Sequence, residues 1–172
     1  MLFRSWPDPP LPEDPAKAVE WISSAADAGS VDALYLYAQR LERGKGVERD
    51  EYEAEKWYLR AAMRGQPAAQ LWLGQRAGDG TNSSPEMNVD SFMWLTLASQ
   101  RGQGKIRTDA AQQRRTLQQK MMPSEVTEAT TRAREWKPLK QQAGLKPDPA
   151  YDEPGGLNVP KGAANAAART GG

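Results

Sequence analysis

Hydrophobic residues recur three and four positions apart along the first hundred residues, which is the spacing of one face of an α-helix. Asp14 and Pro15 form a typical helix start, an acidic cap followed by proline in the first turn. Glycine follows the early apolar stretches, as expected for a residue that adopts the left-handed conformation after a helix. The pattern therefore predicts a series of short helices over residues 14–28, 31–42, 51–64, 68–77 and 89–101.

Three tryptophans indicate that these helices belong to a repeated unit. Trp21, Trp57 and Trp94 stand 36 and 37 residues apart. A shift of 36 residues superimposes identical residues at Ala18/Ala54, Trp21/Trp57, Ala25/Ala61, Ala26/Ala62, Gly29/Gly65, Ala33/Ala69, Gln39/Gln75, Arg40/Arg76 and Gly44/Gly80. A third copy retains Trp94, Ala98, Arg101 and Gly102 and then diverges, as a terminal repeat does. Fixed periods in this range are typical of helical solenoids.

The pattern changes beyond Gly104, where a longer polar helix is expected over residues 105–121 and a final helix over 124–137. The final helix carries Val126, Ala129, Ala133 and Trp136 on one stripe, which would close the open end of the array. We therefore expect an all-α, right-handed solenoid of antiparallel helix pairs with a C-terminal capping helix. Its predicted organisation is a proline-rich N-terminal arm (1–13) with Trp6 as its one large anchor, the solenoid (14–140), and a tail (141–172) that is disordered unless a partner holds it.

Charge and composition limit the classes of function that we expect for this chain. The 172-residue chain has a formal net charge of +1, so nothing overall favours nucleic acid or an anionic membrane. Residues 101–146 nevertheless carry 11 basic and 4 acidic side chains, either as a solvated helical cap or as a docking face for an acidic partner. The N-terminus has no apolar run suited to a signal peptide, and no run is long enough to cross a membrane, so we expect a cytoplasmic protein.

Candidate catalytic and metal-binding chemistry is sparse. Cysteine and histidine are absent, which removes disulfides, the usual neutral-pH proton shuttle and the commonest transition-metal ligands. The acidic residues Glu51, Glu53 and Glu55 lie at a helix start, where negative charge is favourable. The loop Asp79-Gly80-Thr81-Asn82 lacks the further acidic ligands of a calcium loop. We expect no catalysis, no cofactor and no metal.

Nucleic-acid binding is also not expected. The basic residues that could touch RNA lack interleaved exposed aromatic side chains; they are Arg107, Arg114, Arg115, Arg132 and Arg134.

The repeated unit resembles that of a known family. Its first copy is carried by Ala18, Trp21, Ala25, Ala26, Gly29, Ala33, Tyr37, Ala38, Gly44, Gly46, Val47 and Asp50, and its second by Ala54, Trp57, Tyr58, Ala61, Ala62, Gly65, Ala69, Leu73, Gly74 and Gly80. This pattern resembles the Sel-one-like repeat (SLR) family, a relative of the tetratricopeptide solenoids. Phe92 to Gly102 and Lys120 to Trp136 resemble the closing repeat and capping helix of bacterial members. The resemblance implies an adaptor that assembles protein complexes.

By the family pattern, the first helix of each pair lines a concave face, here residues 32–42 and 68–77. We expect the exposed, partner-binding residues there to be Leu36, Gln39, Arg40, Gln70, Trp72, Gln75 and Arg76. Trp72 is either the anchor for an extended peptide or a filler of the core.

The sequence favours a non-catalytic protein–protein interaction adaptor or scaffold that binds a partner segment in this groove. The alternative is an accessory subunit of a larger complex, docked through the arm around Trp6 and the C-terminal tail.

Overall fold

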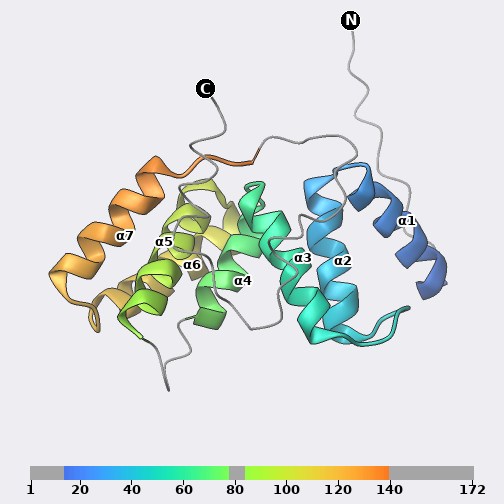
Figure 1. Cartoon of the computed structure of the whole chain (residues 1–172), viewed down its shortest axis with the longest axis horizontal. Helices are drawn as coiled ribbons and strands as arrows, with labels where there is room; N and C mark the ends of the chain where they lie inside the picture. The colour runs from blue at the N-terminus through green and yellow to red at the C-terminus, as the bar shows by residue number, and fades with distance from the viewer. Residues whose placement is uncertain (1–13, 78–83, 140–172) are drawn as a thin grey trace, which may run out of the picture.

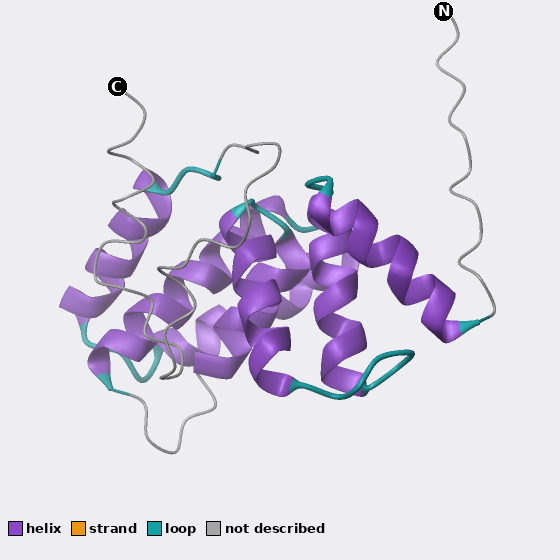
Figure 2. Cartoon of the chain, turned by 45° about the vertical axis from the view of Figure 1, so that its right-hand side comes forward, coloured by secondary structure: helices purple, strands orange, loops and turns teal. Residues whose placement is uncertain are grey.

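Every regular element in the described part of the chain is a helix (Figure 2). The computed structural model describes residues 14–77 and 84–139. The helices are α1 (Pro15–Asp27), α2 (Val31–Arg43), α3 (Glu51–Met63), α4 (Pro67–Ala77), α5 (Pro85–Arg101), α6 (Gly104–Gln118) and α7 (Pro123–Glu135).

The helices are arranged along the long axis of the molecule, from α1 at one end to α7 at the other, with α6 beside α4 and α5 (Figure 1). Each helix from α1 to α5 packs against the next, and α7 packs against α5. The pairs α2–α3 and α4–α5 correspond to the repeated unit, so the predicted all-α solenoid of helix pairs with a C-terminal capping helix is confirmed.

Two helices begin or end at other residues than the sequence predicts. Ser84 caps α5, because its hydroxyl accepts a hydrogen bond from the Met87 backbone N–H at 3.2 Å and Pro85 occupies the first turn. The fifth helix therefore begins at Pro85, four residues before the expected Val89. The sixth ends at Gln118, before the expected Met121, because Pro123 already opens α7.

Small residues at the helix contacts let the backbones approach closely. Ala38, Ala61, Ala62 and Ala69 are fully buried in one core cluster that runs from α1 to α7. Gly74 of α4 is the tightest of these positions, since a Cβ added to it would lie 2.6 Å from Leu95 Cγ of α5. The Ser91 hydroxyl of α5 also donates to the Gly74 carbonyl oxygen. Helices α4 and α5 thus meet at a distance that only glycine permits.

The three repeated tryptophans differ in burial, although their sequence setting is the same. Trp94 is 2% exposed and meets Trp136, which directly follows α7, edge to face at 6.3 Å between ring centroids. Trp57 is half-buried, with its ring 4.8 Å from that of Tyr37. Trp21 is 55% exposed. The repeat therefore does not bury Trp21 as it buries Trp94, because no described helix precedes α1 to cover it.

Polar contacts hold the capping helix in place. Arg132 of α7 pairs with Asp90 of α5 at 2.8 Å, and burial raises the pKa of Asp90 despite this partner. After α7 the chain turns back toward the centre of the solenoid, where the Leu139 N–H donates to the Met63 carbonyl oxygen at 2.9 Å. The Glu125 carboxylate accepts from the Met122 N–H at 2.7 Å, so it caps the start of α7.

Substitution of Gly74 by alanine tests the close α4–α5 contact. At an exposed helical position this change would stabilise the fold by about 0.5–1 kcal/mol. Here we expect a loss of about 1–3 kcal/mol in the free energy of unfolding, because the new methyl group collides with Leu95. Urea denaturation measures the change. In a double-mutant cycle, Gly74→Ala should cost less in the Leu95→Ala background than in the unchanged chain. Stabilisation by Gly74→Ala alone would contradict the packing described.

The unequal burial of Trp94 and Trp21 allows a second test of the fold. We expect Trp94→Ala to lower the free energy of unfolding by about 3–5 kcal/mol, since it opens a cavity beneath α7. Trp21→Ala should cost less than about 2 kcal/mol, because more than half of its side chain is already in solvent. Equal losses in urea denaturation would show that the two side chains are similarly buried.

Candidate functional site

The candidate site is the surface shared by α2 and α4. Leu36 is 37% exposed, Gln75 and Arg76 are exposed, and Gln39, Arg40 and Trp72 are half-buried. We call these six residues the α2–α4 face. Six of the seven residues predicted in the groove therefore reach solvent, and Trp6, the remaining predicted partner-binding residue, lies outside the described residues.

Gln70 corrects the prediction. We expected it on the exposed side, but it is 0% exposed, and its amide Nε2 donates to the Ala62 carbonyl oxygen at 3.1 Å. The reason is the repeat itself, since a shift of 36 residues places Gln70 on Leu34, which is also buried. Its Oε1 atom has no hydrogen-bond partner among the described residues. Gln70 is therefore part of the core and not of the face.

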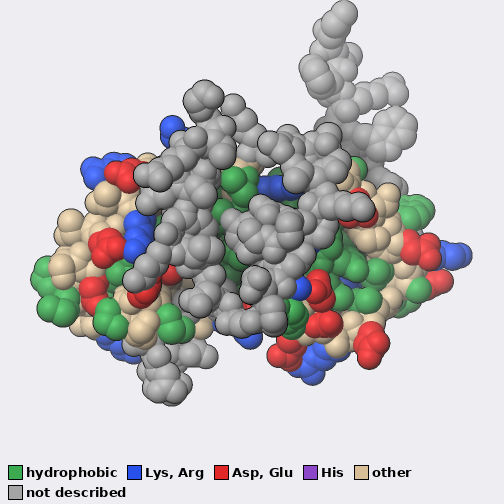
Figure 3. Space-filling model, in the orientation of Figure 1, with side chains coloured by type: hydrophobic (Ala, Val, Ile, Leu, Met, Phe, Trp, Pro, Cys, Tyr) green, Lys and Arg blue, Asp and Glu red, His purple; other side chains and the backbone are tan. Residues whose placement is uncertain are grey.

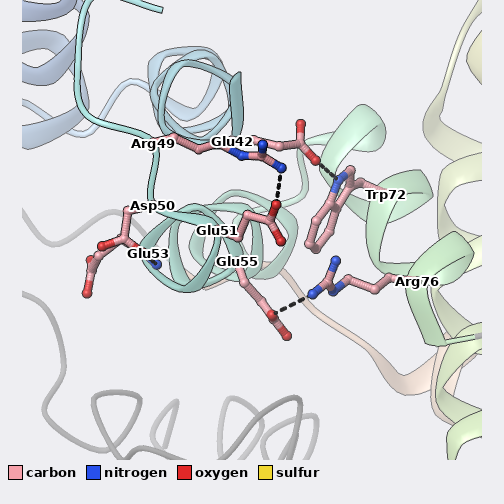
Figure 4. A network of polar contacts seen from close by, with 8 residues as sticks. All are labelled: Glu42, Arg49, Asp50, Glu51, Glu53, Glu55, Trp72 and Arg76. Carbon is pink, nitrogen blue, oxygen red and sulfur yellow. Dashed lines mark hydrogen bonds and ion pairs between the residues drawn. The ribbon is translucent and has the colours of Figure 1, made fainter. Parts of the chain in front are cut away.

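Trp72 is held in position by the neighbouring helices (Figure 4). Its ring stacks on that of Tyr58 from α3, with centroids 4.1 Å apart and an angle of 22° between the planes. Its indole Nε1–H donates to Glu42 Oε1 at 3.0 Å, and the other Glu42 oxygen accepts from the Tyr58 hydroxyl at 2.8 Å. One carboxylate at the end of α2 thus fixes two aromatic side chains from α3 and α4.

Arg76 extends the face along α4. Its guanidinium lies 3.4 Å from Glu55 Oε2 and 5.2 Å from the centre of the Trp72 ring. On α2, the Gln39 amide donates to the Tyr35 hydroxyl at 2.8 Å. Gln39 is therefore engaged within α2 while Gln75 is exposed, so the repeated glutamines do not present equal donors.

Sequence reasoning missed the residues that support the face. Glu42 and Tyr35 were not singled out, Glu55 was considered only with Glu51 and Glu53 at a helix start, and Tyr58 was recognised only as a residue of the repeat pattern. One signal was present, because Tyr35, Gln39 and Glu42 stand four and three residues apart and so share one side of a helix. The contact of Glu42 with Tyr58 and Trp72 depends on how helices pack across repeats, which no local pattern shows.

The electrostatics of the site follow from this packing. Burial, followed by the hydrogen bond to Glu42 and the negative charge of that residue, raises the pKa of Tyr58 well above its ordinary value of 10.0. Burial likewise raises the pKa of Tyr35. Both phenols are therefore neutral hydrogen-bonding groups at physiological pH.

The three glutamates at the start of α3 each have a cationic partner of their own. Glu51 pairs with Arg49, Glu53 with Lys56 at 2.8 Å, and Glu55 with Arg76. Within the residues described, no three acidic, histidine or cysteine side chains gather as a metal site would require. The predicted loop Asp79 to Asn82 lies outside the described residues. The carboxylates thus act as ion-pair partners along α3.

Basic side chains of the C-terminal half are distributed among separate contacts. Arg132 bonds to both Asp90 and Glu128, the Arg107 Nε–H donates to the Gly102 carbonyl oxygen at 2.9 Å, and Arg114 lies 6.0 Å from the Phe92 ring. Acidic and basic side chains are intermixed over the visible part of the described surface (Figure 3).

Comparison with known proteins identifies the repeat. The Sel1 repeat model matches residues 5–30, 31–66 and 67–103, and the last two matches span α2–α3 and α4–α5. The chain belongs to the Sel1 repeat family. Sel1 repeats usually serve in protein–protein interactions, and proteins built from them are typically non-catalytic.

Two similar proteins place the repeats in longer chains. Chitin synthase regulatory factor 3 of Schizosaccharomyces pombe is 37% identical over 67 residues, which are 39% of this chain and 7% of that protein. A protective antigen of uropathogenic Escherichia coli with an SLR fold matches at a TM-score of 0.57 and 29% identity, over 70% of this chain and 25% of the other. The chain thus spans a quarter or less of the length of these relatives. Among the helices described, none is long and apolar enough to cross a membrane.

The raised pKa of Tyr58 predicts a loss of stability in alkali. In the unfolded chain its phenol ionises near pH 10.0, whereas in the folded protein it keeps its proton, so stability is full below pH 10 and falls as the pH rises further. Tyr58→Phe should reduce this fall by up to about 1.4 kcal/mol per pH unit. Urea denaturation of both proteins from pH 8 to 11 measures the slopes. Parallel slopes would show that Glu42 and burial do not hold this proton.

Proposed function

We propose that this protein is a non-catalytic adaptor that binds an extended segment of a partner protein on its α2–α4 face. The observation that carries the proposal is the fixed position of Trp72. Its ring is stacked on Tyr58 and bonded to Glu42, yet it remains half-buried and not fully enclosed. A large aromatic ring fixed in one orientation at a surface loses little entropy on binding, and tryptophan and arginine are the residues most enriched at interaction hot spots.

The surroundings of Trp72 suit a peptide. Gln75 and Arg76 follow it on α4 and are exposed. Leu36 occupies the equivalent position on α2, and its apolar side chain is partly exposed. An extended segment that crosses from α4 to α2 would place one apolar side chain near each of Trp72 and Leu36. Donors of Gln75 and Arg76 would bind its backbone carbonyl or acidic groups.

Site-specific photo-cross-linking tests the face. A photoreactive phenylalanine analogue at Leu36 or Gln75, both exposed, should cross-link the same partner in cells. The matched control is the analogue at Met87, which is 38% exposed at the start of α5 and outside the α2–α4 face. We expect no cross-link to that partner from Met87.

The affinity of the purified partner segment is the quantitative readout. Arg76→Ala should weaken binding about tenfold or more, as loss of a hot-spot arginine does, with the helical circular dichroism unchanged. Equal cross-linking from Met87, or unchanged affinity in Arg76→Ala, would assign the interaction to another surface.

A further inference from the structure

Helix α1 is the second helix of a repeat whose first helix is not among the described residues. It aligns with α3 at a shift of 36 residues, and the glycine that follows each helix has a left-handed φ, 91° at Gly29 and 93° at Gly65. Asp14 and Asp50 cap the two helices through their side chains. Each later repeat pairs such a helix with a preceding one, as α2 precedes α3.

Among the described helices, α1 packs against α2, and its other side is not covered by a described helix. Trp21 is 55% exposed and Ala25 is half-buried, whereas their equivalents in α3 are half-buried Trp57 and fully buried Ala61. Trp57 is covered by Tyr37 of the preceding helix, 4.8 Å away between ring centroids. The opposite end of the solenoid is closed, since α7 brings Trp136 against Trp94. The apolar surface around Trp21 and Ala25 is the unclosed end of the array.

The chain itself supplies apolar residues in the register that this surface requires. The same shift of 36 residues places Met1 on Tyr37 and Leu2 on Ala38. Tyr37 covers Trp57, and Ala38 is fully buried. Leu11 falls on Val47, which packs against the core. The Sel1 repeat model also extends into this region, because its first match begins at residue 5.

The linker must nevertheless differ from the α2–α3 loop. Gly46 has a φ of +83° in that loop, and its equivalent is Pro10, whose ring fixes φ near −65°. From Trp6 to Pro15 the chain has ample length, since an extended chain spans up to about 3.3–3.6 Å per residue. Residues 1–6 can thus reach Trp21, which lies less than two turns into α1.

We propose that residues 1–6 of this chain, with Met1 and Leu2 as contacts, dock on the Trp21–Ala25 surface. The segment would take the place beside α1 that α2 has beside α3. This inference concerns a surface separate from the α2–α4 face and does not depend on it.

Amide hydrogen exchange in α1 tests the docking. Four proteins are compared: the full chain, a chain lacking residues 1–6, Trp21→Ala, and the two changes combined. Deletion should accelerate exchange in α1 about tenfold, as loss of one buried aromatic contact does, while α4 and α5 are unchanged. Because both changes remove the same contact, the combined variant should exchange no faster than either single one.

Controls identify the occupant. Met122→Ala, at a residue 65% exposed at the opposite end, should not alter the effect of the deletion. Light scattering and exchange at two protein concentrations should show a monomer with equal protection. Concentration-dependent protection of α1, or a dimer mass, would overturn the proposal in favour of a second copy. An unchanged α1 exchange rate after deletion would overturn it altogether.

Discussion

The close approach of helices at small residues is the constraint on which this structure depends. Ala61, Ala62 and Ala69 are fully buried, and at Gly74 even a methyl group would collide with Leu95. Larger side chains at these positions would push the helices apart, and the displacement would pass along the stack because each helix contacts only its near neighbours. The same spacing brings the end of α2 within hydrogen-bond distance of α3 and α4, so the α2–α4 face follows directly from the packing.

The repeated tryptophan shows how position in the array sets the role of one residue type. Trp94, Trp57 and Trp21 occupy equivalent places on α5, α3 and α1, yet their burial decreases steadily toward the N-terminus. Nothing in the local sequence distinguishes them. The difference comes from what lies beside each helix, which is the capping segment at Trp136 for Trp94 and the preceding helix for Trp57. The same tryptophan is therefore buried at one end of the array and exposed at the other, because its neighbours differ.

The sequence predicted the helices, the period and the cap because each rests on local spacing, capping residues and glycine conformation. It also predicted that the six residues of the α2–α4 face reach solvent, because helical periodicity separates the buried side from the exposed side. It failed at Gln70, where the polar side chain suggested exposure although its equivalent Leu34 is a core position. It could not find the contacts of Glu42, since these join residues that lie sixteen and thirty positions apart in the chain.

Those contacts explain how a tryptophan can remain available at the surface of an apolar array. Without a hydrogen bond, the Trp72 indole would gain free energy by burying its whole ring beside Tyr58. Its surface would then be inaccessible to a partner. The Nε1–H bond to Glu42 opposes this burial, because the donor would be left unpaired if the ring moved inward. Glu42 in turn stays at the rim, as its second oxygen is held by the Tyr58 hydroxyl. The equivalent residue Leu36, which has no polar atom in its side chain, is 37% exposed. The polar contacts thus favour a half-exposed, fixed ring over a buried one, which is the property that recognition of a partner segment would use.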